Sequence, residues 1–438
     1  MRVVRNKGRR AIVTGVMAIA IGIFSLATLE RWEKPMSSAR LVSIQEFPDV
    51  GEMCLPESTL IAAAPENNLF SALQERSVYA ASQAPGQTTE VTRHPALRYI
   101  RDLDPIYSYI AVDTRRNEVF MQDHNRFSIR VFNRLDNTAP SAVRTEPKRI
   151  IGGPKTSMQF NTCIYIDPKN GDIYSVENDV GDSIVVFGED VEGDVAPMRK
   201  LEVTHRAYAM AVDESKQELF VSVQYPPQVE VYRKTASGKE KPLRVVSGES
   251  TRLSDVHGIA IDEKNKQFFV TNWGNISDPI VAGTGRFELP SISIYPLDAN
   301  GDTSPLRVIQ GPKTQLDWPG NISVDPETGN VYVANDLGNS ILVFRETDNG
   351  DVAPSRVIKG NRTGLSSPVG VFLDGKNKEL WVSNLGNASA TVYPLTASGN
   401  ATPLRTIRSA PAGKVSLKFG KTQAVVYDPN REQVLVPN

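Results

Sequence analysis

Residues 319–360, PGNISVDPETGNVYVANDLGNSILVFRETDNGDVAPSRVIKG, contain the pattern that decides the fold. Four short segments, 321–325, 331–335, 340–344 and 354–358, are rich in β-branched and aromatic residues. The residues between them include the Gly, Asn, Asp and Pro that tight turns require. The stretch therefore predicts a four-stranded antiparallel unit, which needs neighbours to bury its faces.

The rest of the chain repeats this unit, and two markers show the repeat. The first is an Asp that closes the first strand, followed ten residues later by the end of the second strand. Because this interval is constant while others vary, we expect a tight hairpin of fixed register. The second marker is Pro-x-Arg at the start of the fourth strand, seen from 147, 197, 242, 305, 354 and 403. The Asp markers are Asp113, Asp167, Asp213, Asp262, Asp325, Asp374 and Asp428.

The two ends of the repeat region are half-units. Residues 77–82 and 95–100 (SVYAAS and PALRYI) match the last two strands of a unit, and 423–438 match the first two. If these halves complete one another, the ends meet and the array closes without exposed edges. The prediction is an all-β fold with a single domain over 77–438, a seven-bladed β-propeller of four-stranded blades in which the N-terminal and C-terminal half-blades pair.

The repeat resembles the NHL family of β-propellers. PGNISVD with VYVAN, VHGIAID with FFVTN, and PVGVFLD with LWVSN are similar to the family's Pro-x-Gly-Ile-Ala-Val-Asp and Val-Tyr-Val-Ala-Asp/Asn motifs. The resemblance covers 77–438 and implies the fold. It implies little about activity, since these propellers are mostly binding scaffolds with a minority of enzymes.

The first 76 residues are of a different kind. Residues 1–10 carry five Arg or Lys and no acid, and 11–29 are uncharged and apolar. This pattern predicts an N-terminal hydrophobic helix within 1–30, either an export signal or an uncleaved anchor that places the body outside the cytoplasm. Residues 31–76 read as a linker or strap. The remainder of the chain is mildly acidic, which argues against a nucleic-acid partner.

Cys54 and Cys163 are the only cysteines. In an exported chain they could pair, or Cys163 could be a small buried hydrophobe. The sequence leaves both possibilities open.

One asymmetry marks a candidate ligand site. From Asn384 to Tyr393 is nine residues, but from Asn272 to the equivalent Tyr295 is 23, so the fourth blade carries an insertion within 277–291. Long loops on rigid scaffolds often bind ligands, and exposed aromatic residues are typical anchors. The predicted patch across blades three to five comprises Tyr208, Tyr225, His257, Trp273, Phe287 and Trp318. The alternative is a neutral loop with aromatic packing between blades.

The ends of the second strands form a second candidate set. A circle of amides and carboxylates at the channel rim could hold a cation or polar ligand. The alternative is that each side chain caps a nearby loop. The set is Asp123, Glu177, Asn272, Asn335, Asn384 and Asn438.

These patterns favour a non-enzymatic extracytoplasmic domain that binds a protein, peptide or glycan. The other hypothesis is a propeller hydrolase or lyase of the lactonase type with a channel metal. The resemblance would then place metal ligands at the inner positions Ser108, Thr162, Tyr208, His257, Gly320, Val369 and Gln423. One His and no carboxylate occur there, whereas a catalytic metal takes three protein ligands. No catalytic residue, metal or cofactor is therefore expected.

Overall fold

The computed structural model describes residues 104–178, 180–276, 286–416, 426–428 and 433–435, which belong to one compact unit. No helix within these residues is long and apolar enough to cross a membrane. The predicted hydrophobic helix within 1–30, the linker at 31–76 and the start of the repeat at 77–103 lie outside the described residues. The same holds for Gln423 and Asn438.

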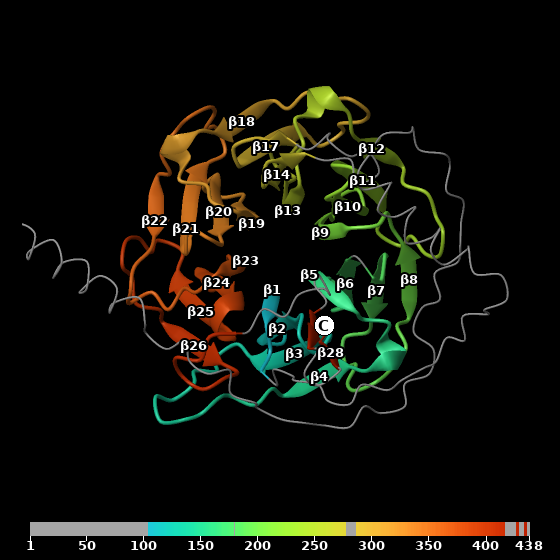
Figure 1. Ribbon diagram of the computed structural model, residues 1–438. Helices are drawn as coiled ribbons and strands as arrows, with labels where there is room; N and C mark the ends of the chain where they lie inside the picture. Colours follow the sequence, from blue (N-terminus) through green and yellow to red (C-terminus); the bar gives the residue numbers. More distant parts are fainter. Residues whose placement is uncertain (1–103, 179, 277–285, 417–425, 429–432, 436–438) are drawn as a thin grey trace, which may run out of the picture. The chain divides into compact units, whose positions relative to one another are not determined.

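Six four-stranded antiparallel sheets form the blades of a propeller, and they follow one another around a ring in chain order (Figure 1). Blades 1 to 3 comprise β1 (Tyr107–Asp113), β2 (Glu118–Asp123), β3 (Ser128–Asn133), β4 (Arg149–Gly152); β5 (Phe160–Ile166), β6 (Ile173–Asn178), β7 (Ser183–Phe187), β8 (Arg199–Glu202); and β9 (Ala207–Asp213), β10 (Glu218–Val223), β11 (Gln228–Arg233), β12 (Arg244–Val246).

Blades 4 to 6 have the same order from the inner strand outward. They comprise β13 (Val256–Asp262), β14 (Gln267–Asn272), β17 (Ser291–Pro296), β18 (Arg307–Gln310); β19 (Pro319–Asp325), β20 (Asn330–Asn335), β21 (Ser340–Arg345), β22 (Arg356–Ile358); and β23 (Pro368–Asp374), β24 (Glu379–Asn384), β25 (Ser389–Pro394), β26 (Arg405–Arg408). Short 3₁₀ turns lie at Pro154–Thr156, Glu249–Thr251, Pro312–Thr314 and Leu385–Asn387.

The predicted hairpin register is confirmed. In blade 5, Asp325 pairs with Asn330 and Pro319 pairs with Asn335. The marker Asp of each blade accepts a hydrogen bond from a backbone N–H of the turn that follows, as from Arg115 N to Asp113 at 2.8 Å and from Lys264 N to Asp262 at 3.0 Å. This local bond explains why Asp recurs at the end of each inner strand.

The prediction of seven blades is wrong, and so is the prediction that the chain ends share a blade. All four strands of blade 1 come from the continuous stretch 107–152, and the ring closes between blades 6 and 1. There the amide of Thr138 donates to the carbonyl of Thr406 at 2.8 Å. The predicted C-terminal half-blade forms β27 (Val426–Asp428) and β28 (Gln433–Leu435), which pair with each other as a separate two-stranded sheet.

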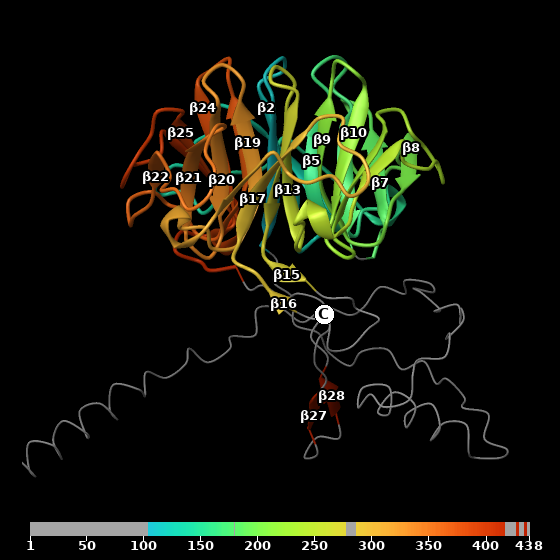
Figure 2. The same ribbon diagram turned by 90° about the horizontal axis from the view of Figure 1, so that it is seen from above.

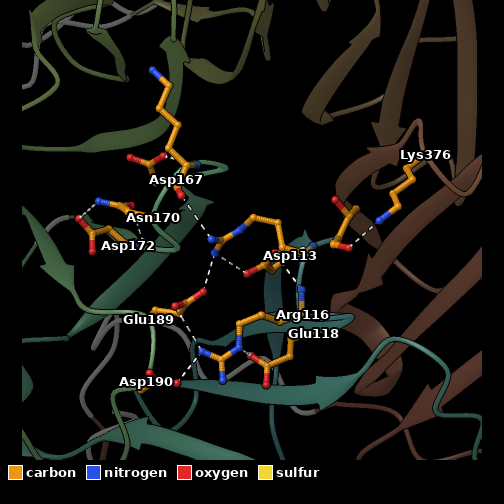
Figure 3. A network of polar contacts seen from close by, with 12 residues as sticks. Asp113, Arg116, Glu118, Asp167, Asn170, Asp172, Glu189, Asp190 and Lys376 are labelled. Atoms are coloured by element: carbon orange, nitrogen blue, oxygen red, sulfur yellow. Dashed lines mark hydrogen bonds and ion pairs between the residues drawn. The ribbon is translucent and has the colours of Figure 1, made fainter.

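The hairpin turns between first and second strands also link neighbouring blades around the whole ring. At the closure, Lys376 Nζ of blade 6 donates to the carbonyl of Thr114 in blade 1. Between blades 1 and 2, Arg116 forms ion pairs with Glu189 and Asp190 (Figure 3). Each of the six junctions has such a contact. They are Arg115 to Lys169 O, Lys169 to Glu214, Glu214 N to Glu263, Lys264 to Pro326 O, Lys378 to Glu327, and Lys376 to Thr114 O.

The Arg of each Pro-x-Arg begins the fourth strand, and five of the six also contact the next blade. Arg199 illustrates this role, since its guanidinium donates to Tyr174 OH in its own blade at 3.0 Å and to the carbonyl of Ala236 in the next blade at 2.8 Å. At the closure, Glu379 accepts from Arg405 of blade 6 and from Arg134 of blade 1. We call these residues the clamp arginines: Arg149, Arg199, Arg244, Arg307, Arg356 and Arg405.

The described members of the predicted polar ring each hold the chain segment that leads into the inner strand. Asn272 Oδ1 accepts from Ser254 N at 3.1 Å, and Glu177 Oε2 accepts from Gln159 N at 2.6 Å. All are fully buried, which places their oxygens against backbone N–H groups of their own blade. The remaining bonds are Ile106 N to Asp123, Asp317 N to Asn335, and Ser366 N to Asn384.

Removing the carboxylate at the ring closure should destabilise the protein strongly. Glu379→Ala leaves Arg134, which is 8% exposed, without its carboxylate partner, and breaking such a buried pair costs about 3–5 kcal/mol. Urea unfolding should show this loss, and hydrogen exchange should rise first in β1 and β24. Glu327→Ala, from the exposed pair with Lys378, should change the free energy of unfolding little, because solvent screens this pair. Equal losses for the two variants would contradict the closure described here.

Glu177 should make stability depend on pH. Burial raises the pKa of this carboxyl from 4.5 to about 8 in the folded protein. The folded state therefore binds one proton more than the unfolded state between these values, so the free energy of unfolding should fall as pH rises from about 5 to 8. Glu177→Gln should abolish that component in urea titrations across this range. Glu192→Gln, at an exposed position, should retain it; an unchanged slope in Glu177→Gln would refute the assignment.

Candidate functional site

Four of the six predicted aromatic residues form one continuous stack. The ring of Tyr208, in β9, lies 4.2 Å from that of His257 in β13, and His257 stacks on Trp273 at 3.5 Å with an interplanar angle of 9°. Trp273 in turn contacts Trp318 at 4.3 Å. Tyr208 and His257 are each the second residue of an inner strand, while the two Trp residues flank β14 and β19. The stack therefore crosses blades 3, 4 and 5.

His257 is the neutral spacer of this stack. It is 1% exposed, and burial lowers its pKa to about 3. Nδ1 lies 2.9 Å from the carbonyl of Asp255, which can only accept, so Nδ1 carries the proton. Nε2 then accepts from Gln224 Nε2 at 3.0 Å. With both nitrogens engaged, His257 positions Trp273.

The solvent end of the stack is Trp318. Its side chain is 41% exposed, whereas Trp273 is half-buried and its indole N–H donates to the carbonyl of Pro319 at 2.9 Å. Trp318 adopts the left-handed backbone region, with φ of 52°. That conformation is uncommon for a bulky aromatic residue, and such outliers are a basis for functional hypotheses.

Tyr225 lies beside the stack in a polar cluster that the sequence did not predict. Its hydroxyl accepts from Asn275 Nδ2 at 2.8 Å, and Arg206 lies over its ring at 5.1 Å. Burial raises the pKa of the neighbouring Asp255 carboxyl to about 6, while hydrogen bonds from Tyr225 and Gln224 act to lower it.

A positional signal could have identified part of this cluster. Arg206, Asp255 and Trp318 each lie seven residues before a marker Asp, and all three have positive φ. This position lies at the same rim in each of the three blades, two residues before the inner-strand position held by Tyr208, His257 and Gly320.

The sixth predicted residue, Phe287, lies in the insertion and stands apart from the stack. Strands β15 (Asn275–Ile276) and β16 (Arg286–Phe287) form a hairpin that projects from one face of the ring (Figure 2). Phe287 pairs with Asn275 in this hairpin and is 68% exposed. The described part of the insertion is thus a hairpin that is joined to blade 3 by the hydrogen bond between Asn275 and Tyr225.

A groove of about 690 Å³ begins next to Tyr225 and Asn275. Two of its lining residues, Pro226 and Ile276, directly follow Tyr225 and Asn275, which are hydrogen-bonded to each other. The lining comes from the loop after β10, the segment that leads into blade 4, the insertion and β18. It consists of Pro226, Pro227, Gln228, Ser247, Gly248, Glu249, Arg252, Leu253, Ile276, Glu288, Leu289 and Gln310.

The other inner-strand positions serve contacts between blades. Ser108 donates to the carbonyl of Asn161 at 3.0 Å, and Thr162 donates to that of Tyr208 at 2.6 Å. Gly320 leaves no room for a side chain, since an added Cβ would lie 2.9 Å from the carbonyl oxygen of Val369. Across the described residues, no three His, Cys, Asp or Glu side chains are grouped to hold a metal ion. Cys163 is buried, with its thiol against the backbone of Met210.

No known family profile matches the sequence, and no curated protein matches it, so the NHL resemblance stays a prediction. Among solved structures, the fold is similar to Kuenenia stuttgartiensis hydrazine synthase, with 10% identity and a TM-score of 0.47 over 68% of this chain and 80% of that chain. It is also similar to a functionally unknown protein from Desulfotomaculum acetoxidans DSM 771, with 12% identity and a TM-score of 0.46 over 71% and 88%. At these identities neither likeness bears on the chemistry of this chain.

Proposed function

We propose that this protein is a non-enzymatic, extracytoplasmic recognition propeller that binds a protein, peptide or glycan through the loop face of blades 3 to 5. The proposal rests mainly on the exposed indole of Trp318 at the end of a stack whose inner members are held by hydrogen bonds. Rigid aromatic anchors on a fixed scaffold dominate binding energy in many interfaces. The basic and apolar N-terminal segment supports export of the body, either cleaved or as a membrane anchor.

A lactonase-like enzyme is a weaker hypothesis for this chain. It would require a set of metal ligands at the inner positions. The described inner positions hold hydroxyl, Gly, Val and Tyr side chains, and His257 has both ring nitrogens engaged. None of these observations favours catalysis over binding.

Truncating Trp318 should weaken recognition strongly while the propeller stays folded. The full-length protein and its Trp318→Ala variant would be purified from the native host after crosslinking, and the recovered partners quantified by mass spectrometry. Loss of a central anchor costs about 2 kcal/mol or more, so recovery of the specific partner should fall about thirtyfold. Thermal unfolding should change little because the indole is at the surface. Met198→Ala, at a position 64% exposed, is the control; equal recovery in all three proteins would refute the proposal.

A further inference from the structure

The groove next to Tyr225 and Asn275 has several aliphatic side chains in its lining. Leu253 is buried within it, while Leu289 is 54% exposed and Ile276 is half-buried. Pro226 and Pro227 supply further apolar surface and no N–H donors. An aliphatic lining would leave many hydroxyl groups of a glycan without partners, at a cost in free energy. Apolar side chains of a polypeptide suit this lining better.

The charged lining is predominantly acidic. Glu249 and Glu288 come from two different segments, the connection into blade 4 and the insertion. The single cationic group, Arg252, donates to Gln310 Oε1 at 2.9 Å, and Gln310 in turn donates to the carbonyl of Leu289 at 2.8 Å. The lining residues thus carry a formal charge of −1. Such a surface attracts cationic side chains.

We propose that this groove binds a polypeptide segment that carries both apolar and cationic side chains. The apolar side chains contact Leu253, Ile276 and Leu289, and a Lys or Arg lies near Glu249 and Glu288. The inference rests on the proposed recognition function and adds the chemical class of the partner. It also extends the site from the aromatic stack, through Tyr225 and Asn275, toward the edge of blade 4.

The test is a fluorescence anisotropy titration of the full-length protein with labelled peptides of one length. Alternating leucine and lysine is the probe, and leucine–glutamate and serine–lysine peptides are its comparisons. The leucine–lysine peptide should bind about tenfold or more tightly than either, a difference of about 1.4 kcal/mol. Rising salt should weaken its binding because the contact with the carboxylates is electrostatic.

Two variants separate the acidic and apolar parts of the groove. Glu249→Gln with Glu288→Gln should lower the affinity for the leucine–lysine peptide about tenfold and reduce its salt dependence. Leu289→Ser should weaken binding with the salt dependence unchanged. Glu192→Gln with Glu327→Gln, and Leu404→Ser at 53% exposure, are matched controls outside the groove and should bind as the parent does.

Equal affinity for the lysine and glutamate peptides, or full affinity in the double Gln variant, would overturn the inference. A glycan probe whose binding depends on Trp318 and not on Leu289 would also overturn it and would leave the recognition function in place. If the peptide results hold while Trp318→Ala recovers every native partner, the proposed function fails and the groove assignment stands.

Discussion

The clamp arginines are the interaction on which this propeller depends. Each begins the outermost strand of a blade, and five of them reach a backbone carbonyl in the following blade while holding a side chain of their own second strand. Carbonyls there are fixed by turn geometry, so every clamp sets the position of one blade against the next. The sixth clamp, Arg405, meets a different partner arrangement, because Glu379 is shared with Arg134 of blade 1. At this junction, where the chain is not continuous, a shared carboxylate therefore supplements the backbone bond from Thr138 to Thr406.

Local features of the fold could be predicted from the sequence because each depends on residues close together in the chain. The marker Asp bonds the turn that follows it, and the ten-residue interval keeps β19 and β20 in register. The number of blades is a nonlocal property and was predicted wrongly. The six Pro-x-Arg motifs matched the six complete blades, whereas Asp428 belongs to β27, in a hairpin with a blade-like sequence outside the ring. The sequence of the C-terminal half-unit does not indicate whether β23 packs against that half-unit or against β1.

The aromatic set shows a similar division. Tyr208, His257, Trp273 and Trp318 were found because the repeat gives each blade the same rim positions, and the structure brings them into one stack. Arg206, Asp255 and Gln224 were missed, although Arg206 and Asp255 share a position in the repeat; the part of Gln224 depends on its contacts with Asp255 and His257 of the next blade. Phe287 was included in the patch because it lies in the insertion, but its hairpin stands apart from the stack and borders the groove. The candidate site thus combines an aromatic stack with a neighbouring groove whose lining is acidic and aliphatic.

The ring begins and ends at neighbouring points, since Lys414 forms an ion pair with Asp104 and the amide of Ser416 donates to Gly386. Among the described residues, each blade is built from one continuous stretch of the chain, so the packing of the blades does not depend on which blade comes first in the sequence. A circular permutant that joins these two points and opens the chain at another blade junction would retain all six sheets intact. In this sense the ring has no obligatory first blade.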